Sequence, residues 1–179
     1  MFKFKLTEDA KKLMELSDNP LITKYDFTPR RMTPGANGFD LSACIFEQEV
    51  VYPNEVVKIP LGVSINLDEQ GLANYSTGMQ GNFPEELTYT LFSFCGFLLP
   101  RSSNKMFILN NTIGLLDSDY KGELFAKVRN IGDECLVIKP GERIIQLVIM
   151  LSYVGPMLEV NSLGKSSRGE GGDGSTGKY

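Results

Sequence analysis

Apolar residues along the chain fall mainly into short alternating or β-branched runs, which is the pattern of strands with one buried face. Turn-forming Pro, Gly and Asn residues separate these runs at the spacing typical of a β-sandwich or β-barrel. We therefore predict an all-β, mostly antiparallel fold. The predicted strands span residues 2–6, 49–59, 63–67, 106–109, 123–129, 135–138 and 144–153.

A helical signal is confined to residues 7–16. Glu8 and Asp9 would lie in the first turn, where carboxylates interact favourably with the helix dipole, and Leu13 and Leu16 are three residues apart. We predict one short helix at most.

Two segments depart from the strand pattern. Residues 68–86 are polar, with three Gly and one Pro, and an apolar run at 87–99 follows them. A loop of that length within a compact domain is usually functional or has structure of its own, so we interpret it as an insertion. Residues 165–179 hold five Gly between positions 169 and 177, which predicts a flexible arm after a single domain of residues 1–164.

The composition limits the chemistry that the chain can perform. A length of 179 residues and an apolar fraction of 42% suffice for one domain with a real core. The absence of His and Trp excludes a His general base, a His-containing zinc site and a triad built on imidazole. Catalysis would have to use carboxylates, hydroxyls, backbone amides or a hard metal ion. The net charge of -4 provides no overall basic field for nucleic acid, so an anionic ligand would be bound by local groups.

Cysteine usage and the N-terminal sequence indicate the compartment. Cys44, Cys95 and Cys135 are odd in number and form no CxxC pair, as expected of reduced thiols. The N-terminus lacks the apolar core of a signal peptide, and no stretch approaches the roughly 20 apolar residues that span a bilayer. We expect a cytoplasmic protein, in the host cytoplasm if it is viral, with no membrane partner.

Five short motifs follow one another along the chain. They are GANGFDLSA at 35–43, PRSS at 100–103, NTIGLLDSDYKGE at 111–123, GERIIQLV at 141–148 and RGEGGDGSTG at 168–177. In this order, on an all-β background, they resemble the motifs of the trimeric dUTPase family. The resemblance implies a distorted β-barrel or jelly-roll-like fold, Mg²⁺-dependent hydrolysis of dUTP to dUMP and pyrophosphate, and a homotrimer with its sites at subunit contacts.

The third motif carries the candidate catalytic residue. Its two glycines, Gly114 and Gly122, bracket a strand, a tight turn and a returning strand that would present Asp117 on a rigid hairpin. Hydrolysis of a phosphoanhydride needs an oriented water, and without His an ionised carboxylate is the natural group to orient and deprotonate it. By resemblance that group is Asp117. The alternative is a turn whose two Asp residues only cap backbone amides.

The same motif carries the candidate nucleoside contacts. By resemblance, the ring of Tyr120 lies against the deoxyribose and excludes a 2′-hydroxyl, while the amide of Asn111 both donates to and accepts from the uracil edge. Backbone groups near Phe125 complete that recognition. The structural alternatives are an ordinary strand Tyr and a turn Asn.

The second and fourth motifs supply candidate phosphate contacts. A guanidinium beside hydroxyl and amide donors suits the oxygens of a leaving pyrophosphate, which indicates Arg101, Ser102 and Ser103. By resemblance Ser102 bonds the oxygen between the α and β phosphates, and Gln146 contacts phosphate. Arg143 has a structural alternative, an ion pair with an acidic neighbour.

Asp40 in the first motif resembles the family's magnesium-holding residue. Mg²⁺ keeps much of its hydration shell and prefers phosphate oxygens and water, so the contact would run through metal-bound water. The alternative is a strand-end Asp that caps the turn at 34–38.

The C-terminal motif resembles a lid over the bound nucleotide, in which glycine amides form a nest for the β and γ phosphates. It departs from the family where an aromatic residue stacks over uracil, because Asp173 stands at that position and adds negative charge. We expect weaker lid closure, lower turnover or a substitute ring, with Tyr179 the only aromatic residue within reach. The residues that the resemblance places over the phosphates are Arg168, Gly171, Gly172, Gly174 and Ser175.

Two other functions remain open. A dCTP deaminase-related enzyme shares the trimeric β architecture and an Arg-Ser-Ser stretch, although the third motif and the glycine-rich arm favour a dUTPase. A regulatory or binding protein on the same fold would have reduced activity and would use the insertion at 68–86 to bind a protein partner.

Overall fold

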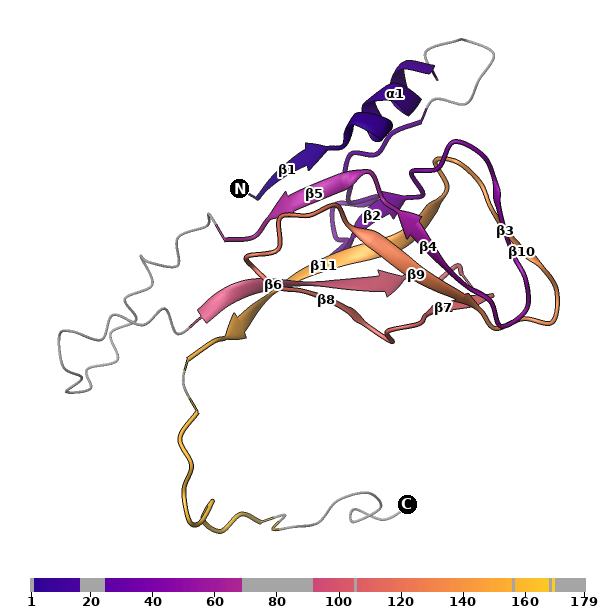
Figure 1. The fold of residues 1–179 in the computed structure, drawn as a ribbon. Helices are drawn as coiled ribbons and strands as arrows, with labels where there is room; N and C mark the ends of the chain where they lie inside the picture. Colours follow the sequence, from indigo (N-terminus) through magenta and orange to yellow (C-terminus); the bar gives the residue numbers. More distant parts are fainter. Residues whose placement is uncertain are drawn as a thin grey trace.

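The computed structural model describes residues 2–16, 25–68, 92–104, 106–155, 157–167 and 169. Within these ranges the chain forms strands and one short helix, and every strand pair is antiparallel (Figure 1). The elements are β1 Lys3–Leu6, α1 Glu8–Leu16, β2 Phe39–Ser42, β3 Glu49–Val51, β4 Val56–Pro60, β5 Val63–Asn66, β6 Phe92–Pro100, β7 Phe107–Leu109, β8 Gly114–Leu116, β9 Phe125–Asn130, β10 Leu136–Ile138 and β11 Arg143–Tyr153. The predicted all-β fold with one short helix is confirmed.

Two sheets share one hydrophobic core. The larger sheet has the order β2-β11-β6-β8, and the smaller has the order β4-β9-β7. Buried Leu41, Leu98 and Leu147 of the first sheet pack in the same cluster as Ile59 and Val128 of the second. Two further pairs, β1 with β5 and β3 with β10, complete the described strands. The long β6 and β11 run side by side through the middle of the molecule, so residues at their ends have a rigid support (Figure 1).

The helix packs in a second, smaller hydrophobic cluster. Thr7 caps the helix, because its Oγ1 accepts a hydrogen bond of 3.2 Å from the backbone N–H of Ala10. Ala10 and Leu13 are buried against Phe27 and Cys44. The described part of the chain contains no helix with the length and apolar character needed to cross a membrane.

The predicted strand at 49–59 is two strands in the structure. A β-turn at residues 52–55 separates β3 from β4: the N–H of Glu55 donates to the carbonyl of Tyr52 at 3.0 Å, and the N–H of Tyr52 donates to the Glu55 carboxylate at 2.8 Å. Asn54 takes a φ of 65°, a conformation that Asn tolerates better than most residues. The strand β2 was not among the predicted strands, because three consecutive buried residues leave no alternation to detect.

The third motif does not form the predicted hairpin. Strand β8 pairs with β6, whereas β9 pairs with β4 and β7, so residues 117–124 cross from one sheet to the other. The turn closes where the N–H of Tyr120 donates to the carbonyl of Asp117 at 3.2 Å. Beyond it, Leu124 donates a backbone hydrogen bond to Val63, the first residue of β5, at 2.8 Å and accepts one from Leu61, directly after β4, at 2.9 Å. Because of these bonds the chain enters β9 next to β4 and does not return alongside β8.

Candidate active site

Residues of the third motif line a cavity of about 170 Å³ at the edge of the larger sheet. Four predicted site residues converge on it from the segment around β8 and from the start of β9: Asn111, Asp117, Tyr120 and Phe125. The apolar part of the wall is formed by Leu98, Leu115, Leu116 and Leu124. The cavity therefore combines an apolar floor with an amide, a carboxylate and a phenol, the usual composition of a pocket for a small organic ligand.

Asn111 is held by a strained turn. The N–H of Ile113 donates to the carbonyl of Asn111 at 2.7 Å, and Thr112 between them has a φ of 59° and donates its own hydroxyl to the same carbonyl at 2.7 Å. A β-branched residue in this region of φ is an outlier, and such outliers concentrate at functional sites. A Cβ on Gly114 would lie 3.6 Å from the amide nitrogen of Asn111, so the backbone there runs close to that side chain. The sequence motif gave no indication of the strained Thr112.

Tyr120 folds back onto its own turn. Its hydroxyl donates to the carbonyl of Glu123 at 2.9 Å, which lays the ring along the cavity wall. Gly122 makes this possible, because a Cβ there would stand 2.5 Å from the Tyr120 hydroxyl and 2.7 Å from the adjoining ring carbon. The side chain of Asp117 is exposed at the cavity and makes no hydrogen bond or ion pair with any other described residue.

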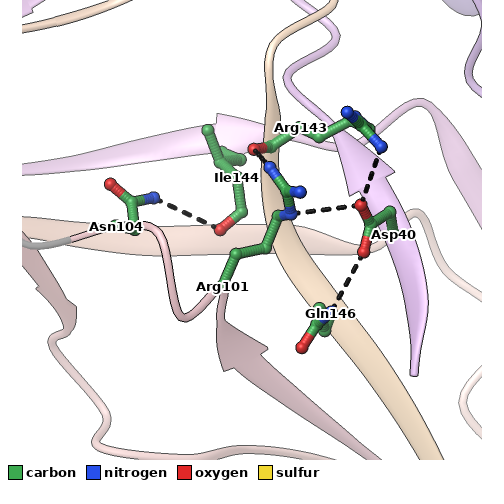
Figure 2. Close-up of polar contacts among 6 residues, drawn as sticks. All are labelled: Asp40, Arg101, Asn104, Arg143, Ile144 and Gln146. Carbon is green, nitrogen blue, oxygen red and sulfur yellow. Dashed lines mark hydrogen bonds and ion pairs between the residues drawn. The ribbon is translucent and has the colours of Figure 1, made fainter. Parts of the chain in front are cut away.

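A second polar group joins the first, second and fourth motifs around Asp40 (Figure 2). The Asp40 side chain is only 3% exposed, and its Oδ2 lies 3.1 Å from Arg101 Nε and 3.2 Å from Arg143 Nη1. Gln146 donates its amide to Oδ1 at 3.1 Å. The buried Nε of Arg101 is not aligned for a hydrogen bond, so its contact with Asp40 is an ion pair. Two guanidinium groups around one carboxylate leave this group with a net positive charge, which suits an anion.

A β-bulge in β11 places two side chains on the same carboxylate. Arg143 and Gln146 are three residues apart, so in a regular strand they would point to opposite faces. The register between β11 and β2 shifts between Arg143 and Ile145, which makes Ile144 an extra residue and brings both side chains to Asp40.

The carbonyls freed by the bulge bind the second motif. Figure 2 shows Arg101 donating from Nη1 to the carbonyl of Arg143 at 3.1 Å and Asn104 donating to the carbonyl of Ile144 at 3.5 Å. The backbone N–H of Arg101 also donates to the carbonyl of Ile144, at 3.3 Å. The turn that follows β6 is thereby fixed against β11, with Ser102 and Ser103 exposed on it. Asn104 and the bulge were not among the predicted features, whereas the ion pair of Arg143 with an acidic neighbour was the predicted structural alternative.

The surroundings of Asp40 determine how it can contact a metal ion. Nothing in the described ranges groups three His, Cys, Asp or Glu residues as a metal cage would. A carboxylate offers about four acceptor positions; Arg143 and Gln146 donate hydrogen bonds to that of Asp40, and Arg101 Nε faces its Oδ2 as an ion pair. The free acceptor capacity suits a metal-bound water, and direct chelation would displace the arginines. Asp40 therefore fits the water-mediated contact and does not cap the turn at 34–38.

The two groups of residues are far apart within one chain. Leu116, the last residue of β8, pairs with Gly96, and continuing that register by one residue puts Asp117 opposite Cys95, six residues before Arg101. At about 3.4 Å a residue, this spacing puts about 20 Å between the backbones of Asp117 and Arg101. The remaining predicted site residues, Arg168, Gly171, Gly172, Gly174 and Ser175, lie outside the described residues, as do Asp173 and all of the insertion except Asp68.

Comparisons with known proteins identify the family. A family model described as dUTPase matches residues 84–177. The chain is 36% identical over 154 residues to deoxyuridine 5′-triphosphate nucleotidohydrolase of Tolumonas auensis, covering 84% of this chain and 87% of that protein. It is 33% identical over 168 residues to the enzyme of the same name from Aeromonas salmonicida, covering 92% and 95%.

Solved structures agree with this assignment. The dUTPase of Streptococcus mutans superposes with a TM-score of 0.56 at 25% identity, covering 89% of this chain and 98% of that one. The dUTPase of Staphylococcus bacteriophage 80alpha, solved with dUpNHpp, has the same fold with a TM-score of 0.65 at 21% identity, covering 99% and 98%. The chain belongs to the dUTPase family, as the five motifs predicted.

Proposed function

We propose that this protein hydrolyses dUTP to dUMP and pyrophosphate. The observation that carries the proposal is the convergence of Asn111, Asp117, Tyr120 and Phe125 on one cavity. An amide for a base edge, a phenol ring for a 2′-deoxy sugar and an exposed carboxylate for a water are the parts that this reaction requires. The curated relatives that carry this enzyme name support the same reaction.

Asp117 is the group that orients and deprotonates the attacking water. Its carboxylate is exposed at the cavity and has no described partner, so it is free to accept a hydrogen bond from that water. The water attacks the α phosphorus, the bond to the oxygen bridging the α and β phosphates breaks, and pyrophosphate leaves.

The positively charged group around Asp40 stabilises the leaving pyrophosphate. Asp40 holds Nε of Arg101, and the carbonyl of Arg143 holds Nη1, which orients the guanidinium and leaves its other N–H groups for phosphate oxygens. Ser102 and Ser103 add hydroxyl and amide donors from the exposed turn, and Gln146 adds a side-chain amide beside Asp40. Charge develops on the leaving group in the transition state, so these donors act there.

Mg²⁺ accompanies the triphosphate and supplies charge neutralisation. Asp40 would hold it through one metal-bound water, at the acceptor position that the arginines and Gln146 leave free.

The active protein is a homotrimer whose sites combine groups from different subunits. A separation of about 20 Å prevents Asp117 and Arg101 of one chain from acting on adjacent atoms of one triphosphate, so each site takes them from two chains. The segment after β11, which leads away from the strands in Figure 1, exposes Met157, Leu158 and Leu163 by 97%, 86% and 98%. Apolar side chains this exposed mark a surface that another chain covers.

The arm and the insertion extend this proposal. Arg168 and the amides of Gly171, Gly172 and Gly174, with Ser175, close over the phosphates of a neighbouring subunit. The insertion at 68–86 remains a predicted surface for a protein partner. The cytoplasm is the proposed location, consistent with the three unpaired cysteines.

A variant and a substrate panel test the function. Asp117→Asn should lower kcat by about 10²–10⁴-fold, the range of a general base, and should leave dUTP binding largely intact. Pyrophosphate release should occur with dUTP far faster than with UTP, dTTP or dCTP, and only with Mg²⁺. Normal turnover by Asp117→Asn would exclude the assigned role, and ammonia release from dCTP would assign the protein to the deaminases.

A further inference from the structure

Lys121 links the turn of the third motif to a strand that lies far away in the sequence. Its Nζ donates to the carbonyl of Ser118 at 2.9 Å and to Oδ1 of Asn66 at 2.5 Å. Asp68 lies at the longer distance of 4.0 Å and is exposed, so it adds little. The ammonium therefore bridges the residue directly after Asp117 and the last residue of β5.

The end of β5 is a fixed point. Val63 and Ile65 of this strand are buried in the main core, and Asn66 is paired with Lys3 of β1. The side chain of Asn66 is itself held, because its Oδ1 also accepts the N–H of Asp68 at 3.1 Å. A group bonded to Asn66 is thereby tied to the core of the domain.

The turn at residues 117–120 has few other ties. The hydrogen bonds of Tyr120 to Asp117 and to Glu123 are internal to the segment that crosses between the sheets. Leu116 pairs with Gly96 at one end of this segment, and at the other end Leu124 is held by its backbone bonds and Glu123 by the N–H of Gly62. Between these two ends, among the described residues, the Lys121 bridge is the contact that ties Ser118 to another element.

We propose that Lys121 is a positioning residue, which fixes the turn against Asn66 so that the Asp117 carboxylate stays aimed at the attacking water. The inference rests on the proposed function for its consequence in catalysis. A general base acts in the transition state, and a displacement of about 1 Å can cost up to about 100-fold in rate. Base recognition depends on Asn111 and Phe125, outside the bridged turn, so substrate binding should change little.

Kinetics distinguish this role from a contact with substrate. Lys121→Met should lower kcat for dUTP about 10-fold with KM changed by less than about 2-fold, and Lys121→Arg, which keeps the charge and the donors, should recover most of the loss. Asn66→Ala should lower kcat similarly, and the double variant should be no worse than either single one, because both remove the same bridge. Lys127→Met, which removes an exposed charge from β9, is the matched control and should behave as wild type.

Hydrogen exchange gives a readout that does not need activity. Amides in the peptide covering 115–124 should exchange faster in Lys121→Met and in Asn66→Ala than in wild type, while those of β9 and β11 should not. A rise in KM at constant kcat, additive losses in the double variant, or unchanged exchange in this peptide would each overturn the proposal. Failure of the wild type to hydrolyse dUTP would instead refute the proposed function, and the exchange data would still decide whether the bridge fixes the turn.

Discussion

Subunit mixing provides the sharpest test of the composite site. Two variants, Asp117→Asn and Arg101→Gln, each remove one of the groups that lie about 20 Å apart in one chain. In the proposed homotrimer, each variant alone leaves every site without one group. Co-expression of the two variants at equal amounts yields an unselected mixture that includes trimers with both kinds of subunit.

The expected recovery follows from the geometry. A complete site in a mixed trimer needs Asp117 from an Arg101→Gln subunit and Arg101 from an Asp117→Asn neighbour. With random assembly at equal amounts, each condition holds for half of the subunits, so about a quarter of the sites are complete. Pyrophosphate release from dUTP by unselected mixtures should therefore reach about a quarter of the wild-type kcat per subunit, far above either variant alone.

The matched control places both substitutions in one chain and mixes it with wild type. If the sites are composite, this control mixture again retains about a quarter of the wild-type activity. If each site is contained in a single chain, the control mixture retains about a half, and the mixture of Asp117→Asn with Arg101→Gln has no activity. Native mass spectrometry verifies that the trimers are mixed. Mixed trimers without recovered activity would refute the composite site.

Three further predictions follow from individual contacts. Gly122→Ala places a methyl group about where the Tyr120 ring now lies, so the preference for dUTP over UTP should fall about 10-fold in kcat/KM; an unchanged ratio would contradict the steric role of Tyr120. Asn130→Ala removes the hydrogen-bond partner of the carbonyls of Val51 and Glu134 and of the N–H of Gly132. Urea denaturation should show a free energy of unfolding lower by about 3 kcal/mol, and a decrease below about 1 kcal/mol would contradict the role given to these hydrogen bonds. Burial, and secondarily the charge of Glu123, raises the pKa of Cys44 from 9.0 to about 11. At pH 8 the thiolate fraction of Cys44 is therefore about 100-fold smaller than that of a thiol with the unshifted pKa. Iodoacetamide should accordingly label exposed Cys135 before buried Cys44. Because the folded pKa is the higher one, the stabilising contribution of Cys44 is complete below pH 9 and is lost as the pH rises towards about 11; equal labelling rates would contradict the shift.

The sequence predicted the elements whose residues alternate. Strands β5, β7, β9, β10 and β11 lie close to their predicted ranges, and the helix follows Thr7 as its capping chemistry requires. Strand β2 was not predicted because consecutive burial of Asp40, Leu41 and Ser42 has no period of two. The sequence predicted one strand at 49–59 where the structure has β3 and β4, because apolar β-branched residues occur on both sides of the turn at 52–55. Asn54 adopts the positive φ in that turn.

The sequence could predict which residues belong to the candidate site, but it could not predict how the strands place them relative to one another. Motif order cannot show that β8 and β9 belong to different sheets, and therefore gave the wrong hairpin for Asp117. Strand periodicity assigns Arg143 and Gln146 to opposite faces, and only the bulge at Ile144 reverses that assignment. Lys121 has no signal of its own in the sequence, because its partner Asn66 is 55 residues away.

The turn at Thr112 has a consequence for engineering. Its backbone conformation costs a β-branched residue on the order of 1–3 kcal/mol, and glycine would adopt it freely. A search for heat-resistant variants would therefore favour replacement of Thr112, which would also remove the hydroxyl that holds the carbonyl of Asn111. Under the proposed function, such a variant would survive heating better and recognise uracil less selectively, so melting temperature alone is a misleading measure of improvement for this protein.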